Sequence, residues 1–406
     1  MNINSTLKSL IAVALLSGLS SFAAVSSEEN NSPAPEATAA EAAISFWDLP
    51  LLEKAFIDTA PALRDGAFPV GELGEGGGKK AMTVKLAEEI ADGKHGNYDS
   101  MLITHKGKLL FESYYMRGRI NLAHGQASAT KAYTSLALGR AMQMGYLTMA
   151  DLDKPLISFL HDLDQAKLVE GAELITLHKA LTMHGGLNVS KEKREELERN
   201  PSQFSIQQIS QLKGQGLAQT LLEHSGPITE ETQVYKYGNF NPMLVMTVID
   251  AVVPGTAKDF IKNEVLDKLD ITNYSWDTHV SGLPEAGWRV KMTSRDMLKW
   301  GSLVLNKGKW NGEQLISAEY LAKATSGLVK PTQDWMPETY RSGYFWYQTP
   351  IAVGDKSYNA TFAWGGGDQR VIVVEELDLT IVITGHDREE KLMAQLSKAV
   401  LPAFVE

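Results

Sequence analysis

A serine and a lysine three positions apart are the first candidates for chemistry in this chain. Ser128 and Lys131 lie in the stretch ASATKAYTSLALGR, and Lys131 carries the only formal charge between Arg119 and Arg140. On a helix, residues i and i+3 share one face, so their side chains can meet. Burial of an unpaired ammonium group is costly and lowers its pKa. A deprotonated Lys131 would be a general base beside Ser128, whose hydroxyl is a weak nucleophile without one.

Two further elements are consistent with this pair doing chemistry, since the Ser-x-x-Lys pattern alone also fits a lysine whose charge reaches solvent along a helix. Tyr237-Gly238-Asn239 stands directly before an apolar helical run. The glycine-rich stretch FAWGGGDQ, residues 362–369, stands directly before a C-terminal pair of strand-like runs. Serine β-lactamases and penicillin-binding proteins use three elements in this order.

These elements resemble the motifs of the class C β-lactamase-like serine hydrolases. That family includes esterases, D-aminopeptidases, DD-peptidases and 6-aminohexanoate-dimer (nylon-oligomer) hydrolases. The resemblance covers roughly residues 98–403. It extends to three further stretches, which are LTMHGGL at 181–187, TSRDM at 293–297 and GKWNG at 308–312.

The resemblance implies acyl transfer through a covalent intermediate. Ser128 attacks a carbonyl and becomes acylated, Lys131 takes its proton, and Tyr237 joins the proton relay. Asn239 is expected to hydrogen-bond either Lys131 or the carbonyl side of the substrate. The family pattern places the oxyanion between two backbone N–H groups, one from Ser128 and the other from the strand start at Gly367 to Gln369. Such a donor typically contributes roughly 10²–10³ in rate.

The third element departs from the family pattern. β-Lactamases of this type carry lysine at its start, and many relatives carry histidine. Here that position holds Trp364, Gly365 or Gly366, which we expect to contact the substrate. No cation stands there to bind the carboxylate of penicillins and cephalosporins, although Arg370 is close in the sequence. Trp364 fits either an aromatic wall of the site or a core position.

We therefore predict a serine hydrolase acting on a small ester or amide. A β-lactamase or DD-peptidase that cleaves D-amino-acid peptides is the alternative, and a binding or sensor module with little turnover is a third reading. A Ser-His-Asp hydrolase is disfavoured because no G-x-S-x-G elbow occurs. His124 and His184 are expected to be structural. The nine histidines form no H-x-H or H-E-x-x-H pair, so neither a metal nor a cofactor is expected.

The elements that position these residues predict an α+β protein. Residues 100–104 and 108–115 read as one β-hairpin and residues 370–374 and 379–385 as another, which suggests a single antiparallel sheet built from both ends of the chain. Between them, Thr176, Thr256 and Thr293 are placed to cap helices. Asn241-Pro242 is placed to open a helix that ends before Pro254-Gly255. The expected fold is β-lactamase/transpeptidase-like, an antiparallel sheet flanked by helices with a mainly helical inserted domain.

The N-terminus and the composition indicate where the protein acts. Lys8, an apolar run at 10–16 and Ser21-Phe22-Ala23 have the layout of a secretory signal peptide. We expect residues 1–24 to be that signal, 25–45 a flexible spacer, 46–150 with 286–406 a discontinuous α/β domain, and 151–285 a mainly helical domain. The protein is then periplasmic or secreted, without a membrane span in the mature chain. A net charge of −10 disfavours nucleic acid as a partner, and the absence of cysteine excludes thiol catalysis.

Overall fold

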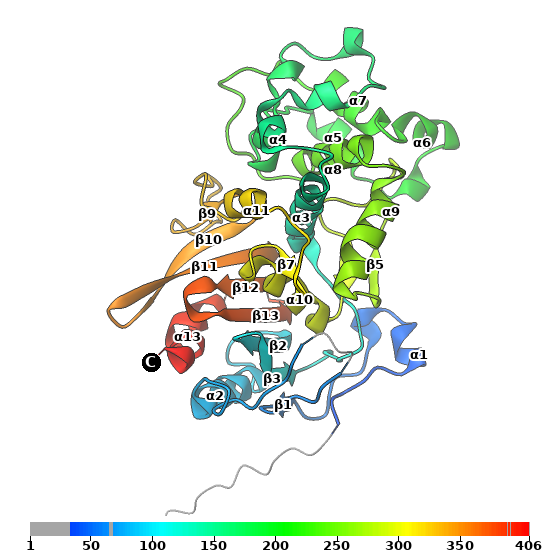
Figure 1. The fold of residues 1–406 in the computed structure, drawn as a ribbon. Coiled ribbons are helices and arrows are strands. Elements are labelled where there is room, and N and C mark those ends of the chain that lie inside the picture. Colours follow the sequence, from blue (N-terminus) through cyan, green and yellow to red (C-terminus); the bar gives the residue numbers. More distant parts are fainter. Residues whose placement is uncertain (1–32, 65–67, 388, 390, 406) are drawn as a thin grey trace, which may run out of the picture. The chain divides into compact units, whose positions relative to one another are not determined.

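The fold is known from a computed structural model that describes residues 33–64, 68–387, 389 and 391–405 (Figure 1). The predicted signal peptide, 1–24, lies outside the described residues. Within the predicted spacer, α1 (Ala39–Ala42) begins at a capping box in which Thr38 and Glu41 bond each other's backbone. The backbone N–H of Ala37 donates to the Asn121 side chain. Part of the spacer is therefore held against the rest of the chain.

An eight-stranded antiparallel sheet forms the centre of the described chain and confirms both predicted hairpins. Strands from the two ends of the chain meet in its middle, because β2 pairs with β13 along its length (Figure 1). The short, mainly apolar strand runs and the short turns of the two hairpins account for their formation. In spatial order the strands are β1 (Phe56–Asp58), β3 (Lys108–Tyr114), β2 (Tyr98–His105), β13 (Leu379–Gly385), β12 (Gln369–Val374), β11 (Lys356–Gly365), β10 (Tyr347–Val353) and β9 (Arg341–Ser342).

Helices cover both faces of this sheet, as expected for an α+β fold. Val371 and Val373 of β12 pack with α3 (Thr130–Gln143) and α10 (Ser294–Leu305) in one core. Ile372 and Val374 point the opposite way, into a second core with α2 (Lys80–Ala91) and the C-terminal helices α12 (Met393–Gln395) and α13 (Leu401–Phe404). Successive residues of a strand face opposite sides, so a continuous apolar run here serves two cores.

The remaining helices include α4 to α9, which lie within residues 177–261 and gather on one side of the sheet in Figure 1. Their bounds are α4 (Leu177–Leu181), α5 (Lys191–Leu197), α6 (Ile206–Leu212), α7 (Gly216–Glu223), α8 (Phe240–Val252), α9 (Ala257–Ile261) and α11 (Ala318–Ala324). Two small sheets complete the fold, one of β4 (His124–Gly125), β6 (Val290–Met292) and β5 (Tyr274–Trp276), the other of β7 (Lys309–Trp310) and β8 (Glu313–Gln314).

The helix starts agree with the sequence in all cases but one. Thr176, Thr256 and Thr293 accept backbone N–H groups as N-caps. The predicted start of α8 is wrong by two residues, because Asn239 rather than Asn241 occupies the N-cap position, and its side chain makes no capping bond. Pro242 does lie in the first turn, but the first four N–H groups of a helix have no partner within it, so proline fixes the start only to within a turn.

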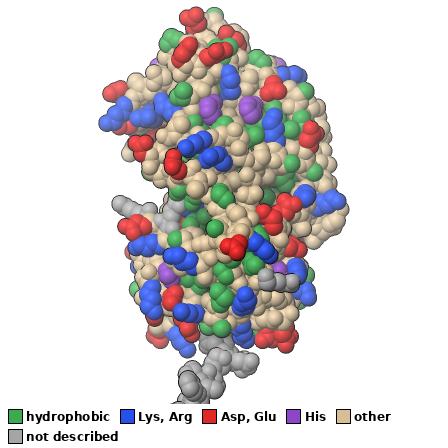
Figure 2. Space-filling model, turned by 90° about the vertical axis from the view of Figure 1, so that its left-hand side faces the viewer, with side chains coloured by type: hydrophobic (Ala, Val, Ile, Leu, Met, Phe, Trp, Pro, Cys, Tyr) green, Lys and Arg blue, Asp and Glu red, His purple; other side chains and the backbone are tan. Residues whose placement is uncertain are grey.

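The described surface carries mixed charge. On the face drawn in Figure 2, lysine and arginine side chains are interspersed with aspartate and glutamate. Among the described residues, no helix combines the length and the apolar character needed to cross a membrane.

Candidate active site

Ser128 lies in a tight turn directly before α3. Residues Ala127–Ala129 form a single 3₁₀ turn that leads into the helix. Ala127 has a φ of 44°, a left-handed conformation that few non-glycine residues adopt. Gln126 is buried and anchors the turn: its backbone N–H donates to the Val290 carbonyl at 2.8 Å, and its side-chain oxygen accepts from the Tyr133 hydroxyl at 2.9 Å. The hydrogen bonds of Gln126 therefore hold the turn in its left-handed conformation.

The amine of Lys131, the lone charge in this helix, is buried beside the Ser128 hydroxyl. Its side chain is buried, with the residue 2% exposed, and its Nζ lies 3.1 Å from Ser128 Oγ and 2.9 Å from the Gly287 carbonyl oxygen. Burial lowers the pKa of Lys131 to about 7, while the nearby Glu285 carboxylate acts in the opposite direction. Near neutral pH, much of the amine is therefore free of its extra proton and able to accept one.

Tyr237 completes the group around the serine. Its ring centre lies 5.0 Å from Lys131 Nζ. Burial raises the pKa of its phenol, and a hydrogen bond with Ser128 opposes that shift. The phenol therefore keeps its proton at neutral pH and can donate it. Tyr237, which is 106 positions after Lys131 in the sequence, is brought to Ser128 and Lys131 by the segment that precedes α8.

The glycine-rich end of β11 packs against the turn Ala127–Ala129, which holds the predicted nucleophile Ser128 and is called the nucleophile turn below. A Cβ added to Gly365 would lie 2.2 Å from the Gln126 carbonyl oxygen, so only glycine fits there. Gly367 has a φ of 86° and lies in the turn between β11 and β12. A side chain at Gly366, in contrast, would meet open space. The backbone of this turn can therefore approach a substrate bound to Ser128.

A cavity of about 340 Å³ opens at these residues. Trp335 and Trp364 form an aromatic wall, their ring centres 5.4 Å apart, and Tyr237 packs edge-on against Trp335 at 5.4 Å. The described lining contains two carboxylates and neither lysine nor arginine. It consists of Ser128, Tyr237, Trp335, Trp364, Gly366, Gly367, Asp368 and Asp387.

Arg370, the cation considered from the sequence, does not line this cavity. It is fully buried, pairs with Asp368 at 2.5 Å, and has its guanidinium 4.6 Å from the Trp364 ring centre. Asp368 also accepts a hydrogen bond from the Tyr98 hydroxyl at 2.8 Å. Arg370 thus packs on the buried side of the Trp364 ring and does not reach the cavity.

Besides Lys131 and Gly365, the predicted site residues Asn239 and Gln369 are not part of the cavity lining. Asn239 has its amide against Gly287, where it would contact a Cβ added to that glycine. No bond to Lys131 is found, since among the described residues the amine bonds Ser128 and Gly287. The Gln369 side chain donates to the Gly385 carbonyl, and its backbone starts β12. The roles of these residues stay predictions.

The two histidines considered from the sequence lie in structural contacts. His124 Nε2 is 3.2 Å from an Asp99 carboxylate oxygen, and His184 Nδ1 is 2.7 Å from the Thr182 carbonyl oxygen.

Four residues at the site carry no signal in the sequence. The Gly287 carbonyl, Glu285, Trp335 and Asp387 come from loops without a recognisable pattern. A buried amine requires acceptors, so the existence of a partner for Lys131 was foreseeable. Its identity was not, because Gly287 is 156 positions away along the chain.

Comparison with known proteins gives the same family by an independent route. Residues 86–401 match the family described as Beta-lactamase. A comparison with curated proteins finds no match.

Solved structures share the fold at low sequence identity. A penicillin-binding protein homologue from Caulobacter crescentus is 12% identical, with a TM-score of 0.59 over 80% of this chain and 97% of its own. A D-stereospecific amidohydrolase from Streptomyces sp. is 13% identical, with a TM-score of 0.58 over 79% and 99%. A class C β-lactamase in complex with cefoxitin is 13% identical, with a TM-score of 0.58 over 80% and 98%. Such identities establish the β-lactamase/transpeptidase-like fold alone.

The match to the family spans most of the chain and includes Ser128, Lys131, Tyr237 and the glycine-rich turn. The resemblance inferred from the sequence is therefore confirmed, and the fold and family point to a serine hydrolase. The chain belongs to the Beta-lactamase family.

Proposed function

We propose that this protein is an exported serine hydrolase that cleaves a small ester or amide through an acyl-enzyme on Ser128. The observation that carries the proposal is the buried Lys131 amine, 3.1 Å from the serine hydroxyl and with a pKa of about 7. A lysine used only for packing would not need its amine beside a partly exposed serine. Export rests on the signal-like residues 1–24.

In acylation, Ser128 Oγ attacks the substrate carbonyl carbon as its proton passes to Lys131 Nζ. The C–O bond to the serine forms, and the carbonyl oxygen becomes an oxyanion. The backbone N–H groups of Ser128 and of the turn at Gly367 to Gln369 are assigned to that oxyanion. The tetrahedral intermediate collapses when Tyr237 donates its phenolic proton to the leaving oxygen or nitrogen, and the phenolate takes the proton held by Lys131.

In deacylation, a water molecule attacks the ester carbon of acyl-Ser128. Tyr237 and Lys131 accept the water proton and return one to Ser128 Oγ as the acyl group leaves. The enzyme ends in its starting protonation state, so no external acid or base is consumed. The closeness of the phenol to both Ser128 and Lys131 supports this cycle.

The lining of the cavity favours an acyl group that is not an anion. Trp335 and Trp364 offer apolar surface, and Asp387 repels a carboxylate. Penicillins and cephalosporins carry a carboxylate for which the described lining offers neither lysine nor arginine. A β-lactamase or DD-peptidase remains the second candidate, since the fold is shared with a class C β-lactamase and a penicillin-binding protein homologue.

Covalent labelling tests the nucleophile. A fluorophosphonate probe is expected to label the native protein once and not to label Ser128→Ala. Ser135 lies on the same helix and bonds the Tyr320 hydroxyl at 2.8 Å, so Ser135→Ala is a matched control that should still be labelled. Absence of labelling in the native protein would favour a binding or sensor module.

Turnover of two chromogenic substrates tests the substrate class. We expect p-nitrophenyl butyrate to be hydrolysed with a higher kcat/KM than nitrocefin. Both activities should disappear in Ser128→Ala. Predominant nitrocefin hydrolysis would reverse the ranking in favour of a β-lactamase.

A further inference from the structure

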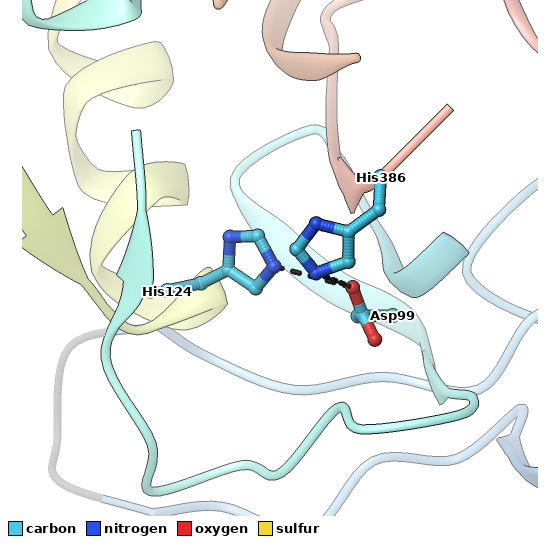
Figure 3. Close-up of side chains that lie close together, drawn as sticks. All are labelled: Asp99, His124 and His386. Atoms are coloured by element: carbon cyan, nitrogen blue, oxygen red, sulfur yellow. Dashed lines mark hydrogen bonds and ion pairs between the residues drawn. The ribbon is translucent and has the colours of Figure 1, made fainter. Parts of the chain in front are cut away.

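A buried cluster of one carboxylate and two imidazoles lies outside the cavity. Asp99 belongs to β2, His124 to β4, and His386 directly follows β13 (Figure 3). The ligand atoms of all three residues lie within 4.8 Å of one another. Asp99 is 1% exposed and the His386 side chain 20% exposed. Three segments that are distant in the sequence therefore bring potential metal-ligating atoms close together.

The distances within the cluster fit the shell of a transition metal. One Asp99 carboxylate oxygen lies 3.2 Å from His124 Nε2 and 2.9 Å from His386 Nε2. Ligand atoms of a tetrahedral zinc ion with bonds of about 2.0–2.1 Å are about 3.3 Å apart. His386 Nε2 forms no hydrogen bond of good geometry despite its short distance to the carboxylate. The Nε2 atom of His386 therefore lies near the Asp99 carboxylate but has no hydrogen-bond partner among the described residues.

The outer contacts of the cluster fix the ligand atoms in place. His124 Nδ1 lies 3.1 Å from the Gly125 carbonyl oxygen, which only accepts, so Nδ1 carries a proton. In this tautomer the Nε2 lone pair faces the Asp99 carboxylate oxygen 3.2 Å away, so a metal ion between them would take both groups as ligands. The second Asp99 oxygen accepts the Arg117 backbone N–H at 3.1 Å. Metal-binding histidines and carboxylates in proteins have these same outer partners.

We propose that Asp99, His124 and His386 bind a divalent transition metal, with Zn²⁺ as the ion of best fit. Two imidazole nitrogens among three ligands disfavour Mg²⁺ and Ca²⁺, which prefer oxygen. The partly exposed side of His386 leaves room for water as a fourth ligand. Phe46 and Trp47 pack on the His386 ring with centres 4.8 and 4.4 Å away and shield the rest.

The position of the cluster indicates a structural role for the metal. His124 precedes Ser128 by four residues, and His386 is followed by Asp387, which lines the cavity. An ion held by both would tie the approach to the nucleophile turn to the end of β13. Metal-dependent stability, rather than metal-dependent chemistry, is the expected consequence.

Titration of the metal-free full-length protein with Zn²⁺ tests the proposal. The protein is treated with chelator, dialysed and titrated by calorimetry, and its bound metal is measured by mass spectrometry. We expect one Zn²⁺ per chain, no comparable binding of Mg²⁺, and a higher Tm with Zn²⁺. His386→Ala and Asp99→Asn should each weaken Zn²⁺ binding at least tenfold and abolish the Tm increase.

His95 supplies the matched control. It pairs with Glu89 at 3.0 Å and lies outside the cluster, so His95→Ala should bind Zn²⁺ like the native protein. Circular dichroism identifies a variant that fails to fold, in which case His386→Gln takes its place. Absence of stoichiometric Zn²⁺ binding, or equal binding by the His386 variants, would overturn the proposal.

Discussion

At the scale of single residues, the site depends on an amine deprived of water. Lys131 has two hydrogen-bond acceptors and a pKa lowered by burial, whereas Tyr237 has a pKa raised by burial. The same desolvation makes the amine a better proton acceptor at neutral pH and keeps the phenol protonated. In the proposed mechanism, one buried environment thus supplies both the general base and the general acid.

Removal of either relay group should slow acylation without unfolding the protein. Loss of a general acid or base typically costs roughly 10²–10⁴-fold. Lys131→Ala and Tyr237→Phe are each expected to lower kcat/KM for p-nitrophenyl butyrate within that range. Circular dichroism serves as the fold control. Near-native turnover in either variant would contradict the assigned relay.

The pH dependence follows from the Lys131 amine. The base acts in its neutral form, so kcat/KM should rise tenfold per pH unit below about 7 and level off above it. The Glu285 carboxylate raises the pKa of Lys131, so Glu285→Gln should move this rise to lower pH. The glutamine oxygen can still accept the Gly287 backbone N–H that Glu285 accepts at 3.2 Å. A rise that moves to higher pH would contradict this electrostatic coupling.

At the scale of elements, the candidate site forms where the turn before α3 packs against the end of β11. The turn before α3 and the end of β11 meet at Gly365, where a Cβ would lie 2.2 Å from a backbone oxygen. Backbone cannot move aside as a flexible side chain can. Gly365→Ala should therefore lower the free energy of unfolding by about 1–3 kcal/mol.

Gly366→Ala is the matched substitution for this prediction. Its Cβ would meet no atom within 4 Å, so its free energy of unfolding should stay near that of the native protein. Urea denaturation of the two variants measures the difference. Equal stabilities would show that β11 does not press on the nucleophile turn.

Some elements of the fold and of the site were predictable from the sequence, and others were not. The two hairpins were predictable because their apolar strand runs and the turns between them are local features of the sequence. The contact between Ser128 and Lys131 was predicted from helical spacing together with the two later motifs, because the spacing alone also fits a lysine whose charge reaches solvent. The start of α8 was misplaced because proline tolerates several first-turn positions. The cluster of Asp99, His124 and His386 was missed because no short motif links three segments that meet only in the folded protein.

At the scale of the whole molecule, a buried ion pair links strand β3 of the first hairpin to helix α10 in the second half of the chain. Arg295 of α10 donates to both oxygens of Glu112 on β3, at 2.9 and 2.6 Å, and Glu112 is 1% exposed. The Tyr114 hydroxyl donates to the same carboxylate at 2.7 Å. Loss of the arginine would leave a buried carboxylate without its main counter-charge.

Arg295→Met should therefore lower the free energy of unfolding by about 3–5 kcal/mol. Lys330 pairs with Glu338 on the surface at 3.2 Å, and Lys330→Met should leave stability almost unchanged because water screens that pair. Chemical denaturation of both variants measures the contrast. A small effect at Arg295 would indicate that α10 is held by apolar packing alone.

The adjacency of β2 and β13 has a consequence for biosynthesis. The nucleophile is made in the first third of the polypeptide, but the backbone assigned to the oxyanion, and the strand that joins it to the first hairpin, are synthesised close to the end. A nascent or prematurely terminated chain would carry Ser128 and Lys131 without the backbone assigned to the oxyanion. Hydrolytic competence would then arise only after translation is almost complete, which keeps an unfinished molecule inert in the compartment where it is made.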